Sequence, residues 1–224
     1  MKTVYGPVPS RRLGRSLGVD PVPLKTCNYS CVYCQVGRTV PLTNERRDCF
    51  PPSKILADVI GALAGWEARS EPPIDYITLV GQGEPLLCAS LGWVIQQIKA
   101  HTGIRVAVIT NGSLLYRPEV REELGTADVV LPSLDAADQV GFRRINRPWP
   151  TLSIEQIIEG LVAFRAGFAG WLWIEVMLVR GINDDETSLL GIRDALRRIR
   201  PDQIHLGLPV RPPAEAWVQP PDDE

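Results

Sequence analysis

Residues 26–35 read TCNYSCVYCQ, and this stretch holds three of the chain's five cysteines: Cys27, Cys31 and Cys34. Thiolates are soft ligands that select zinc or iron–sulfur clusters. A structural zinc site normally closes with four protein ligands, whereas this stretch offers three. A cubane cluster held by three cysteines keeps one iron without a protein ligand and therefore open to a small molecule. The spacing C-x3-C-x2-C favours such a cluster over three unrelated cysteines.

A fourth ligand could come from elsewhere in the chain, and four residues are candidates. His101 and His205 are the two histidines, and Cys49 and Cys88 are the remaining cysteines. Cys88 follows the segment GQGEP without a C-x2-C partner, and Cys49 lies in a charged connector. A buried or incidental thiol is the simpler interpretation for each of these two cysteines.

The composition is that of an ordinary globular protein. The chain has 224 residues, of which 45% are hydrophobic and 22% charged, and its net charge is -2. These values exclude a polycation and a disordered chain, and the length suits one α/β domain. We expect a single domain over residues 1–224, with an N-terminal extension at about 1–15 and a proline-rich C-terminal tail at about 209–224.

The N-terminal residues MKTVYGPVPSRRLG contain no apolar run after their charges. No segment approaches the roughly 18 to 20 apolar residues that a membrane-spanning helix needs. Three crowded cysteines in a set of five also do not resemble the disulfide framework of a secreted protein. We therefore expect a cytoplasmic protein that does not enter a membrane.

Short β-rich runs alternate with amphipathic helical patterns, which is typical of repeated βα units. Strands are predicted at residues 16–22, 76–80, 105–110, 129–133, 171–179 and 203–208. Helices are predicted from the cap Ser53, over 91–100 and 118–124, from a Ser153–Gln156 capping box, and from Asp184 or Asp185 to about Ile199. Six strands predict an α/β fold, a partial (β/α)6 TIM-like barrel of mostly parallel strands.

Parallel βα folds place their functional groups in the loops that follow the carboxyl ends of the strands. Five successive loops at this predicted edge carry an unusual motif. In chain order these are the cysteine segment, GQGEP (81–85), TNG (110–112), SLDA (133–136) and RGINDDE (180–186). Because they are predicted to share one rim, together they indicate a site more strongly than any one motif alone.

In this combination and order, the motifs resemble those of the radical S-adenosylmethionine (SAM) enzymes, from Cys27 to about Leu208. The resemblance implies that Cys27, Cys31 and Cys34 hold a catalytic [4Fe-4S] cluster. The open iron of that cluster would bind the amino and carboxylate groups of SAM. Tyr33, the aromatic residue before the last cysteine, would contact the adenine.

The family's GGEP motif occurs here as Gly81, Gln82, Gly83, Glu84 and Pro85, with Gln82 in place of a glycine. By resemblance, its backbone acceptors and the Glu84 carboxylate would receive the methionine ammonium through charge-assisted hydrogen bonds. Glycines would let the chain approach closely.

Polar residues of the later loops complete the implied SAM site. By similarity, Ser133 and Asp135 would bind the ribose hydroxyls or the methionine end, and Asn111 would lie beside them. Asn183 would be placed near the adenine. Turn formation after Pro132 is an alternative role for Ser133, and helix capping is an alternative for Asn183.

The implied reaction starts when the reduced cluster donates one electron to the sulfonium of SAM. A 5'-deoxyadenosyl radical then removes a hydrogen atom from the substrate, while the protein positions the reactants and excludes water. A reducing partner such as a flavodoxin or a ferredoxin would supply the electron.

The segments YGPVPSRRLGRSLGVDPVPLKTC, RRINRP and RPPAE resemble a branch of iron–sulfur oxidoreductases related to the wybutosine-synthesis enzymes, which rebuild a guanosine in transfer RNA. Those enzymes carry a second cluster on cysteines upstream of the radical motif. This chain has no cysteine before Cys27, so we do not expect it to run that reaction unchanged.

Two groups of arginines flank the predicted site. Arginine binds phosphate and carboxylate groups, so an anionic substrate such as a nucleotide or RNA is predicted. The candidate residues are Arg11, Arg12 and Arg15 before the cysteines, and Arg143, with Arg144 and Arg147, after the fourth strand. A solvated basic surface, or salt bridges with Glu45, Asp48 and their neighbours, is the structural alternative.

Three functional hypotheses stay open at this point. The first is a radical SAM enzyme that acts on a nucleotide, a nucleic acid or another anionic molecule. The second is an activase that makes a glycyl radical on a partner protein. The third is a non-catalytic iron–sulfur or zinc binding module, which would need a fourth protein ligand.

Overall fold

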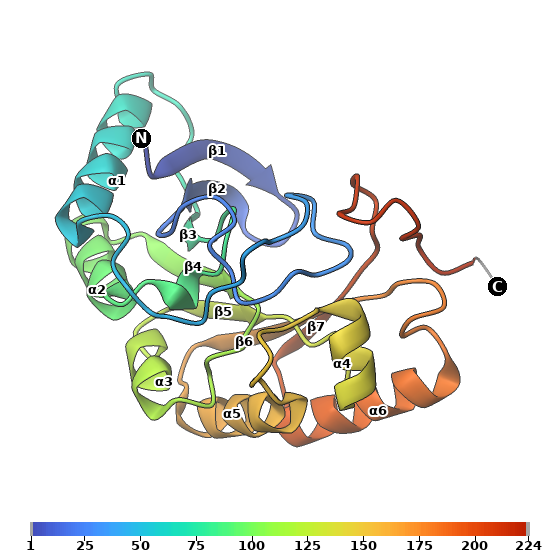
Figure 1. Ribbon diagram of the computed structural model, residues 1–224. Helices are drawn as coiled ribbons and strands as arrows, with labels where there is room; N and C mark the ends of the chain where they lie inside the picture. The colour runs from blue at the N-terminus through green and yellow to red at the C-terminus, as the bar shows by residue number, and fades with distance from the viewer. Residues whose placement is uncertain (1, 223–224) are drawn as a thin grey trace.

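The computed structural model describes residues 2–222, so the ends of the predicted 1–224 domain and 209–224 tail lie outside the described residues. A seven-stranded sheet runs in the order β1-β2-β3-β4-β5-β6-β7 (Figure 1). The strands are β1 (Val4–Ser10), β2 (Gly14–Val19), β3 (Tyr76–Leu79), β4 (Arg105–Thr110), β5 (Val129–Pro132), β6 (Trp171–Met177) and β7 (Gln203–Gly207). Strands β2 to β7 are parallel, which confirms the predicted partial barrel.

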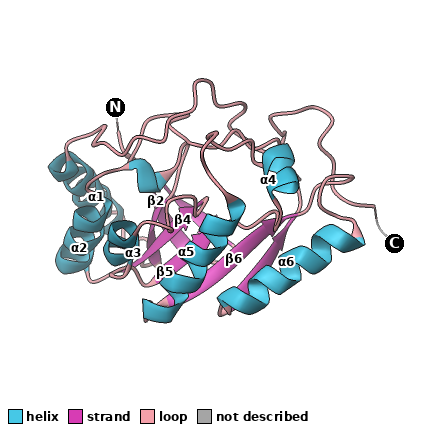
Figure 2. Ribbon diagram, turned by 60° about the horizontal axis from the view of Figure 1, so that its bottom comes forward, coloured by secondary structure: helices cyan, strands magenta, loops and turns pink. Residues whose placement is uncertain are grey.

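The chain also forms helices, most of which cover the outside of this curved sheet. They are α1 (Pro52–Glu67), the 3-10 helix η1 (Pro85–Leu87), α2 (Leu91–Thr102), α3 (Pro118–Leu124), α4 (Gln139–Ile145), α5 (Ile154–Gly167) and α6 (Glu186–Ile199). Figure 2 shows long loops gathered at one end of the sheet, with α4 among them. This is the end where the parallel strands finish, so the predicted motif loops share one rim.

The predicted N-terminal extension is in fact the edge strand β1, which pairs antiparallel with β2. Proline lacks a donor for a strand ladder and is tolerated only at edges and bulges. Pro7 and Pro9 therefore hid this strand in the sequence, although its position at the sheet edge accommodates both. Tyr5 of β1 covers Gly18 of β2 so closely that a Cβ there would lie 2.2 Å from the tyrosine ring.

Side chains alternate between the two faces of each strand, and both faces are filled. On the face covered by helices, residues such as Leu17, Ile77 and Val108 join the main core. On the inner face, a smaller cluster contains Leu13, Tyr76, Ala107, Val129, Leu131 and Trp173. The inner face of the sheet therefore carries a second, smaller apolar cluster.

Two helix starts differ from the predicted caps. Helix α1 begins at Pro52, a residue suited to the first turn, so Ser53 lies inside the helix and is not its cap. Ser153 holds the N-cap position of α5 but makes no capping hydrogen bond with its side chain. The Ile154 N–H instead donates to Gln139 Oε1 at 3.0 Å. The capping-box prediction is therefore wrong.

The starts of helices α6 and α4 are both capped by an aspartate. Asp185 caps α6 by accepting from Ser188 N at 3.0 Å, as one of the two predicted candidates. Helix α4 was not predicted, because it lacks the proline that marks the start of the equally short α3. Its cap is Asp138, which accepts from the N–H groups of Val140 and Gly141, each at 2.9 Å.

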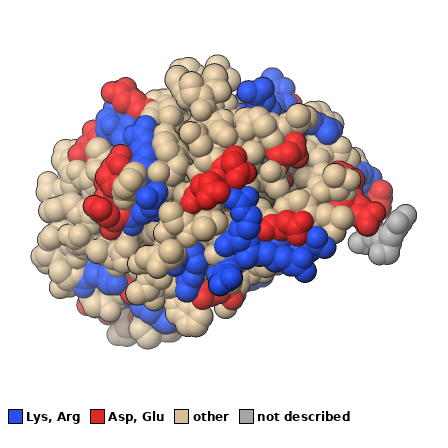
Figure 3. Space-filling view, turned by 90° about the horizontal axis from the view of Figure 1, so that it is seen from below, with Lys and Arg blue, Asp and Glu red and all other residues tan. Residues whose placement is uncertain are grey.

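No helix follows β7 in the described residues, and the chain instead runs into the tail. The outer side chains of β7 are consequently exposed, with Ile204 50% and Leu206 69% accessible. Seen from below, acidic and basic side chains intermingle on the helical side of the molecule (Figure 3). Arg198 of α6, for example, pairs with Glu155 of α5 at 3.0 Å. Within residues 2–222, no helix is both long and apolar enough to span a membrane.

Asp58 of α1 fastens the start of the chain, because its carboxylate accepts from Thr3 N and Thr3 Oγ1, each at 2.9 Å. The hydrogen bond from Lys54 lowers the pKa of Asp58 to about 2. A lowered pKa means that the stabilisation is present above about pH 4 and is lost as the pH falls through about 2. We expect Asp58→Asn to reduce the free energy of unfolding by about 1 kcal/mol at neutral pH, with a smaller difference at pH 3.

Urea unfolding of both proteins over a pH series measures this difference. Asp194→Asn is a matched control, because Asp194 pairs with Arg193 on the exposed surface of α6. A difference for Asp58→Asn that stays constant down to pH 3 would contradict the expected linkage.

Candidate active site

The cysteine segment crosses the carboxyl end of the sheet after β2. Its three thiols are free and half-buried. Each sulfur accepts a polar contact: Cys27 from Tyr29 N at 3.4 Å, Cys31 from Asn146 Nδ2 at 3.5 Å, and Cys34 from Lys25 Nζ at 3.9 Å. N–H groups directed at sulfur orient the ligand and favour its anionic form. The loop therefore presents three oriented thiols on one rim.

A second loop braces the cysteine segment along its length. This second loop comprises residues 145–149 and starts at the end of helix α4. Val32 N donates to Ile145 O at 2.9 Å, and Trp149 N donates to Asn28 O at 2.7 Å. The segments are 113 or more residues apart in sequence for these contacts, so the tertiary fold sets the loop conformation. The RRINRP motif thus supports the cysteine loop with its backbone.

Burial strongly disfavours charge at the thiols of Cys27 and Cys31 when they carry no metal. Desolvation, with a smaller contribution from the nearby Glu84 charge, raises the pKa of Cys27 to about 12. Burial also raises the pKa of Cys31. Metal binding requires thiolates and releases their protons, so a cationic centre would supply the charge that the site otherwise lacks.

The donor set suits a cluster better than a single metal ion. Within residues 2–222, no three His, Cys, Asp or Glu side chains converge as ligands of one ion. A zinc ion needs such convergence, whereas a [4Fe-4S] cluster offers a separate iron to each thiolate. Neither histidine joins the thiols: His101 bonds Gln97 O on the exposed face of α2, and His205 packs against Trp173. Cys88 is buried in the core.

Glu84 ties the GQGEP loop to the end of β4. Its buried carboxylate accepts from Leu86 N at 2.9 Å, from Asn111 N at 2.7 Å and from the Thr110 hydroxyl. Burial raises its pKa to about 7, although all three hydrogen bonds act in the opposite direction. Most of the accepting capacity of Glu84 is therefore used within the protein, to hold two rim loops together.

Glycines in this loop permit close approach to the cysteine segment. A Cβ at Gly83 would lie 2.4 Å from the carbonyl oxygen of Thr26, and one at Gly81 would lie 1.5 Å from Asp20 Oδ1. Gly81 also has a φ of +150°. The loop therefore packs directly behind the residue that precedes Cys27.

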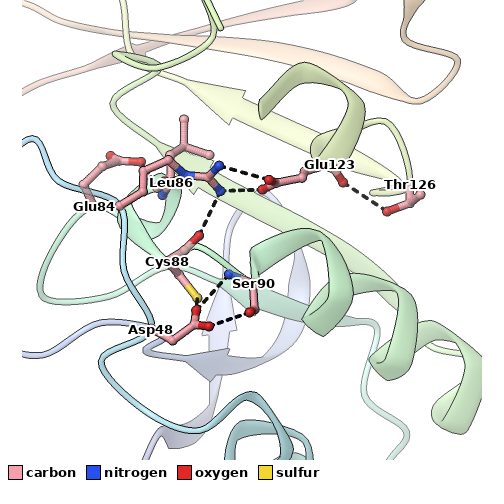
Figure 4. A network of polar contacts seen from close by, with 8 residues as sticks. Asp48, Glu84, Leu86, Cys88, Ser90, Glu123 and Thr126 are labelled. Carbon is pink, nitrogen blue, oxygen red and sulfur yellow. Dashed lines mark hydrogen bonds and ion pairs between the residues drawn. The ribbon is translucent and has the colours of Figure 1, made fainter. Parts of the chain in front are cut away.

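Figure 4 shows how the connector after the cysteines locks η1 in place. Arg46 donates to Leu86 O at 2.8 Å and to Cys88 O at 3.0 Å, and it pairs with Glu123 of α3. Asp48 accepts from Ser90 N at 2.8 Å. Asp48 therefore serves the start of α2, and the predicted alternative of a salt bridge to the arginine groups does not apply to it.

The TNG loop contacts the first cysteine. The Asn111 amide donates to Asn28 Oδ1 at 2.8 Å and lies 3.8 Å from Cys27 Sγ. Asn28 is fully buried and donates in turn to Ser113 Oγ at 2.7 Å. This chain of amides links the loop after β4 to the cysteine segment.

Asp135 makes the corresponding link on the other side. Its buried carboxylate accepts from the Tyr33 hydroxyl, from Asn146 Nδ2 at 2.7 Å and from Met177 N at 2.8 Å. Burial raises its pKa to about 6. The Asn146 amide also donates to Cys31, so one carboxylate organises the β5 loop, the end of β6 and the cysteine segment.

Asn183 is buried and stabilises the loop after β6. Its amide donates to Asp135 O and to Met177 O, each at 2.8 Å, and its oxygen accepts from Val179 N at 2.8 Å. Ser133 differs from these residues, because its half-buried hydroxyl takes no part in the networks described above. It lies between Thr110 O, which its N–H reaches at 3.1 Å, and Glu175.

The chain matches the family model described as Radical SAM superfamily over residues 22–190. It belongs to the radical SAM superfamily. That matched span begins before the cysteine segment and includes every motif loop up to the start of α6.

Individual relatives agree with this assignment. The UPF0026 protein of Methanocaldococcus jannaschii is 40% identical over 227 residues, which cover 100% of this chain and 68% of that protein. A GTP 3',8-cyclase of Chlorobaculum tepidum is 32% identical over 178 residues, or 78% of this chain and 49% of that enzyme. The crystal structure of a radical SAM methyltransferase from Sphaerobacter thermophilus shares the fold, with a TM-score of 0.68 at 16% identity, over 92% of this chain and 59% of that one.

The predicted arginine group does not gather at one mouth of this radical SAM fold. Arg15 donates to Pro73 O at 2.8 Å, at the end of β2 opposite the one that leads into the cysteines. Arg11 lies in the turn at that same end, whereas Arg12 pairs with Glu175 of β6 at 2.7 Å. Arg143 is exposed in the last turn of α4.

Sequence reasoning missed the asparagines that connect the motifs. Asn28 and Asn146 are both buried. Asn28, next to Cys27, accepts from the Asn111 amide, and Asn146 donates to Cys31 Sγ. Buried amides need partners, and a polar residue next to a cysteine motif is the signal that could have drawn attention to Asn28. For Asn146, the only signal in the sequence was its position in the RRINRP motif.

We predict that Gly83→Ala displaces the cysteine segment, because its new methyl group would meet the Thr26 carbonyl. The expected loss is about 1 to 3 kcal/mol of unfolding free energy, with faster reaction of the site thiols with a thiol reagent. Gly65→Ala is the control, because Gly65 lies in α1 with open space around it. Equal stability and equal thiol reactivity of Gly83→Ala and the wild type would refute the close packing.

Proposed function

We propose that this protein is a radical SAM enzyme in which Cys27, Cys31 and Cys34 hold a [4Fe-4S] cluster. The observation that carries the proposal is the set of three oriented, half-buried thiols on the carboxyl rim of the sheet. When bound, the cluster and SAM supply a 5'-deoxyadenosyl radical that removes hydrogen from a substrate. Everything else in the site serves binding and position.

The rim residues divide into two proposed roles. Groups that remain accessible would contact SAM directly, and these are the backbone of Gly81 and Gly83 and the hydroxyl of Ser133. Pro85 is buried, and its carbonyl accepts from Cys88 N at 3.0 Å, so it would shape the loop instead. Residues whose polar atoms are used within the protein would position the loops, and these are Tyr33, Glu84, Asn111, Asp135 and Asn183. A carboxylate has about four lone-pair sites, so Glu84 can still accept from the methionine ammonium.

We further propose that a polar anionic molecule such as a nucleotide binds beside β6 and β7. There, Arg12 pairs with Glu175, and Trp173 packs edge-on against His205 at 5.5 Å between ring centroids. Among the described residues, Trp173 Nε1 and His205 Nε2 are buried without a hydrogen-bond partner. Buried polar atoms are normally paired, so these two atoms support a ligand site. The similarity to a GTP 3',8-cyclase favours a nucleotide.

The narrower predictions rest on the sequence alone. Assignment to the wybutosine-related branch, and RNA as the substrate, rest on the N-terminal run and on the RRINRP and RPPAE segments. The flavodoxin or ferredoxin donor and the cytoplasmic location rest on the resemblance and on the composition. Activation of a partner protein is an alternative that glycyl-radical formation after mixing would support. A closed metal module would show a metal spectrum that SAM leaves unchanged.

The cluster assignment is tested by anaerobic reconstitution with iron and sulfide. We expect the electron paramagnetic resonance signal of the reduced protein to shift when SAM is added, and 5'-deoxyadenosine to form. Cys31→Ala should abolish both, while Cys49→Ala should leave both intact, because Cys49 lies in the connector before α1. Tightly bound zinc, or a paramagnetic resonance signal that does not change when SAM is added, would overturn the proposed function.

The substrate proposal is tested with GTP as the probe. Arg12→Gln should weaken GTP binding about tenfold or more, because it removes a charged donor and leaves the Glu175 carboxylate to repel the anion. Binding should also weaken between about 50 mM and about 200 mM salt. Arg15→Gln is the control, since Arg15 bonds Pro73 O. Equal loss in both variants, or no binding to the wild type, would remove this proposal.

A further inference from the structure

The C-terminal tail returns to the cysteine loop. In Figure 1 the red tail lies beside the blue loops, and a backbone hydrogen bond from Glu215 N to Val32 O joins them. Two motifs without a role in the proposed chemistry meet there: RPPAE (211–215) and RRINRP (143–148). The contact is formed by Glu215 of the first motif and Arg147 of the second.

Glu215 is the centre of a three-residue ion cluster. Its side chain is 6% exposed, and its two oxygens accept from Arg38 Nε and Nη2, each at 2.7 Å. Oε1 also accepts from Arg147. Paired N–H groups on a carboxylate give the strong, directional form of this interaction. The hydrogen bonds from Arg38, and then those from Arg147, lower the pKa of Glu215 to about 2, so it is charged at neutral pH.

The three members come from segments that each adjoin the thiols. Arg38 follows Cys34 by four residues, and Arg147 follows Asn146, whose amide contacts Cys31 Sγ at 3.5 Å. Glu215 N donates to the carbonyl of Val32, between Cys31 and Cys34, at 3.1 Å. The tail therefore contacts the cysteine loop through both its backbone and its charge.

The backbone of Val32 is held from both sides. Its N–H donates to Ile145 O at 2.9 Å, while its carbonyl accepts from Glu215, and its side chain is fully buried. Val218, which is 6% exposed, packs into the main core and donates to Glu215 O at 3.0 Å. These contacts fix the position of the tail next to the cysteine loop.

We propose that the Arg38–Glu215–Arg147 cluster is a clamp, with Glu215 as the positioning residue that holds the cysteine loop against residues 145–149. The clamp fixes the spacing of Cys31 and Cys34, and in its effect on iron it rests on the cluster proposed above. It also assigns Arg147 to an intramolecular partner rather than to substrate.

The tail offers a matched control. Arg180, after β6, pairs with Asp222 at 2.5 Å and donates to Pro220 O at 3.0 Å. This second anchor holds the same tail but does not touch the cysteine loop. Asp222→Asn therefore removes a tail ion pair without disturbing the clamp.

Hydrogen–deuterium exchange of the full-length protein, with and without reconstitution, tests the clamp directly. We expect Glu215→Gln to speed exchange about tenfold in peptides covering residues 28–37 and in the tail, whereas Asp222→Asn should affect the tail alone. Unchanged exchange at 28–37 in Glu215→Gln would overturn the clamp. Arg38→Lys is a second variant, because lysine keeps the charge but loses the paired donors, and it should give a smaller change at the same peptides.

Loss of iron to a chelator gives the second measurement. Changes in partners of metal ligands typically cost 10- to 100-fold in metal affinity, so we expect Glu215→Gln to release iron at least about tenfold faster. Glu215→Asp should restore part of the retention, and Asp222→Asn should match the wild type. Equal rates of iron release from Glu215→Gln and Asp222→Asn would contradict the clamp, because the effect would then come from packing of the tail in general. A wild type that binds no cluster would instead refute the proposed function, and the exchange experiment would still decide the clamp.

Discussion

Two buried carboxylates constrain the rim of this molecule. A buried carboxylate is costly unless donors surround it. Glu84 accepts from one group of its own loop and two of the loop after β4, and Asp135 accepts from three separate segments. If a loop moved away, a charge or a polar group would be left without its partner. The loops after β2, β3, β4, β5 and β6 therefore hold one another in position before any ligand is present.

This constraint explains why similar residues can have different roles. Ser133 keeps a half-buried hydroxyl outside the networks, whereas the amide of Asn183 is fully engaged with neighbouring carbonyls and an N–H group. The first is suited to meet a ligand, and the second is suited to fix the backbone that meets it. Arg147 resembles Asn183 in this respect, since it pairs with Glu215 of its own chain.

Local pattern was sufficient for much of the fold and for the cysteines. The bounds of β4 and α3 agree with the predicted ranges, because a buried parallel strand reads as a short apolar run and Pro118 marks a helix start. Strand β1 was missed because its prolines obscure the pattern. The clamp could not have been predicted, because Arg38 and Glu215 lie 177 residues apart and only the folded chain shows that they meet. For the same reason, the grouping of arginines in the sequence did not predict where they lie.

The two edges of the sheet have unequal capacity to accept another strand. Pro7 and Pro9 remove hydrogen-bond donors from β1, which makes that edge a poor template for strand addition. Strand β7 contains no proline and presents Ile204 and Leu206 on an uncovered face. Of the two edges, β7 is therefore the better suited to pair with an additional strand.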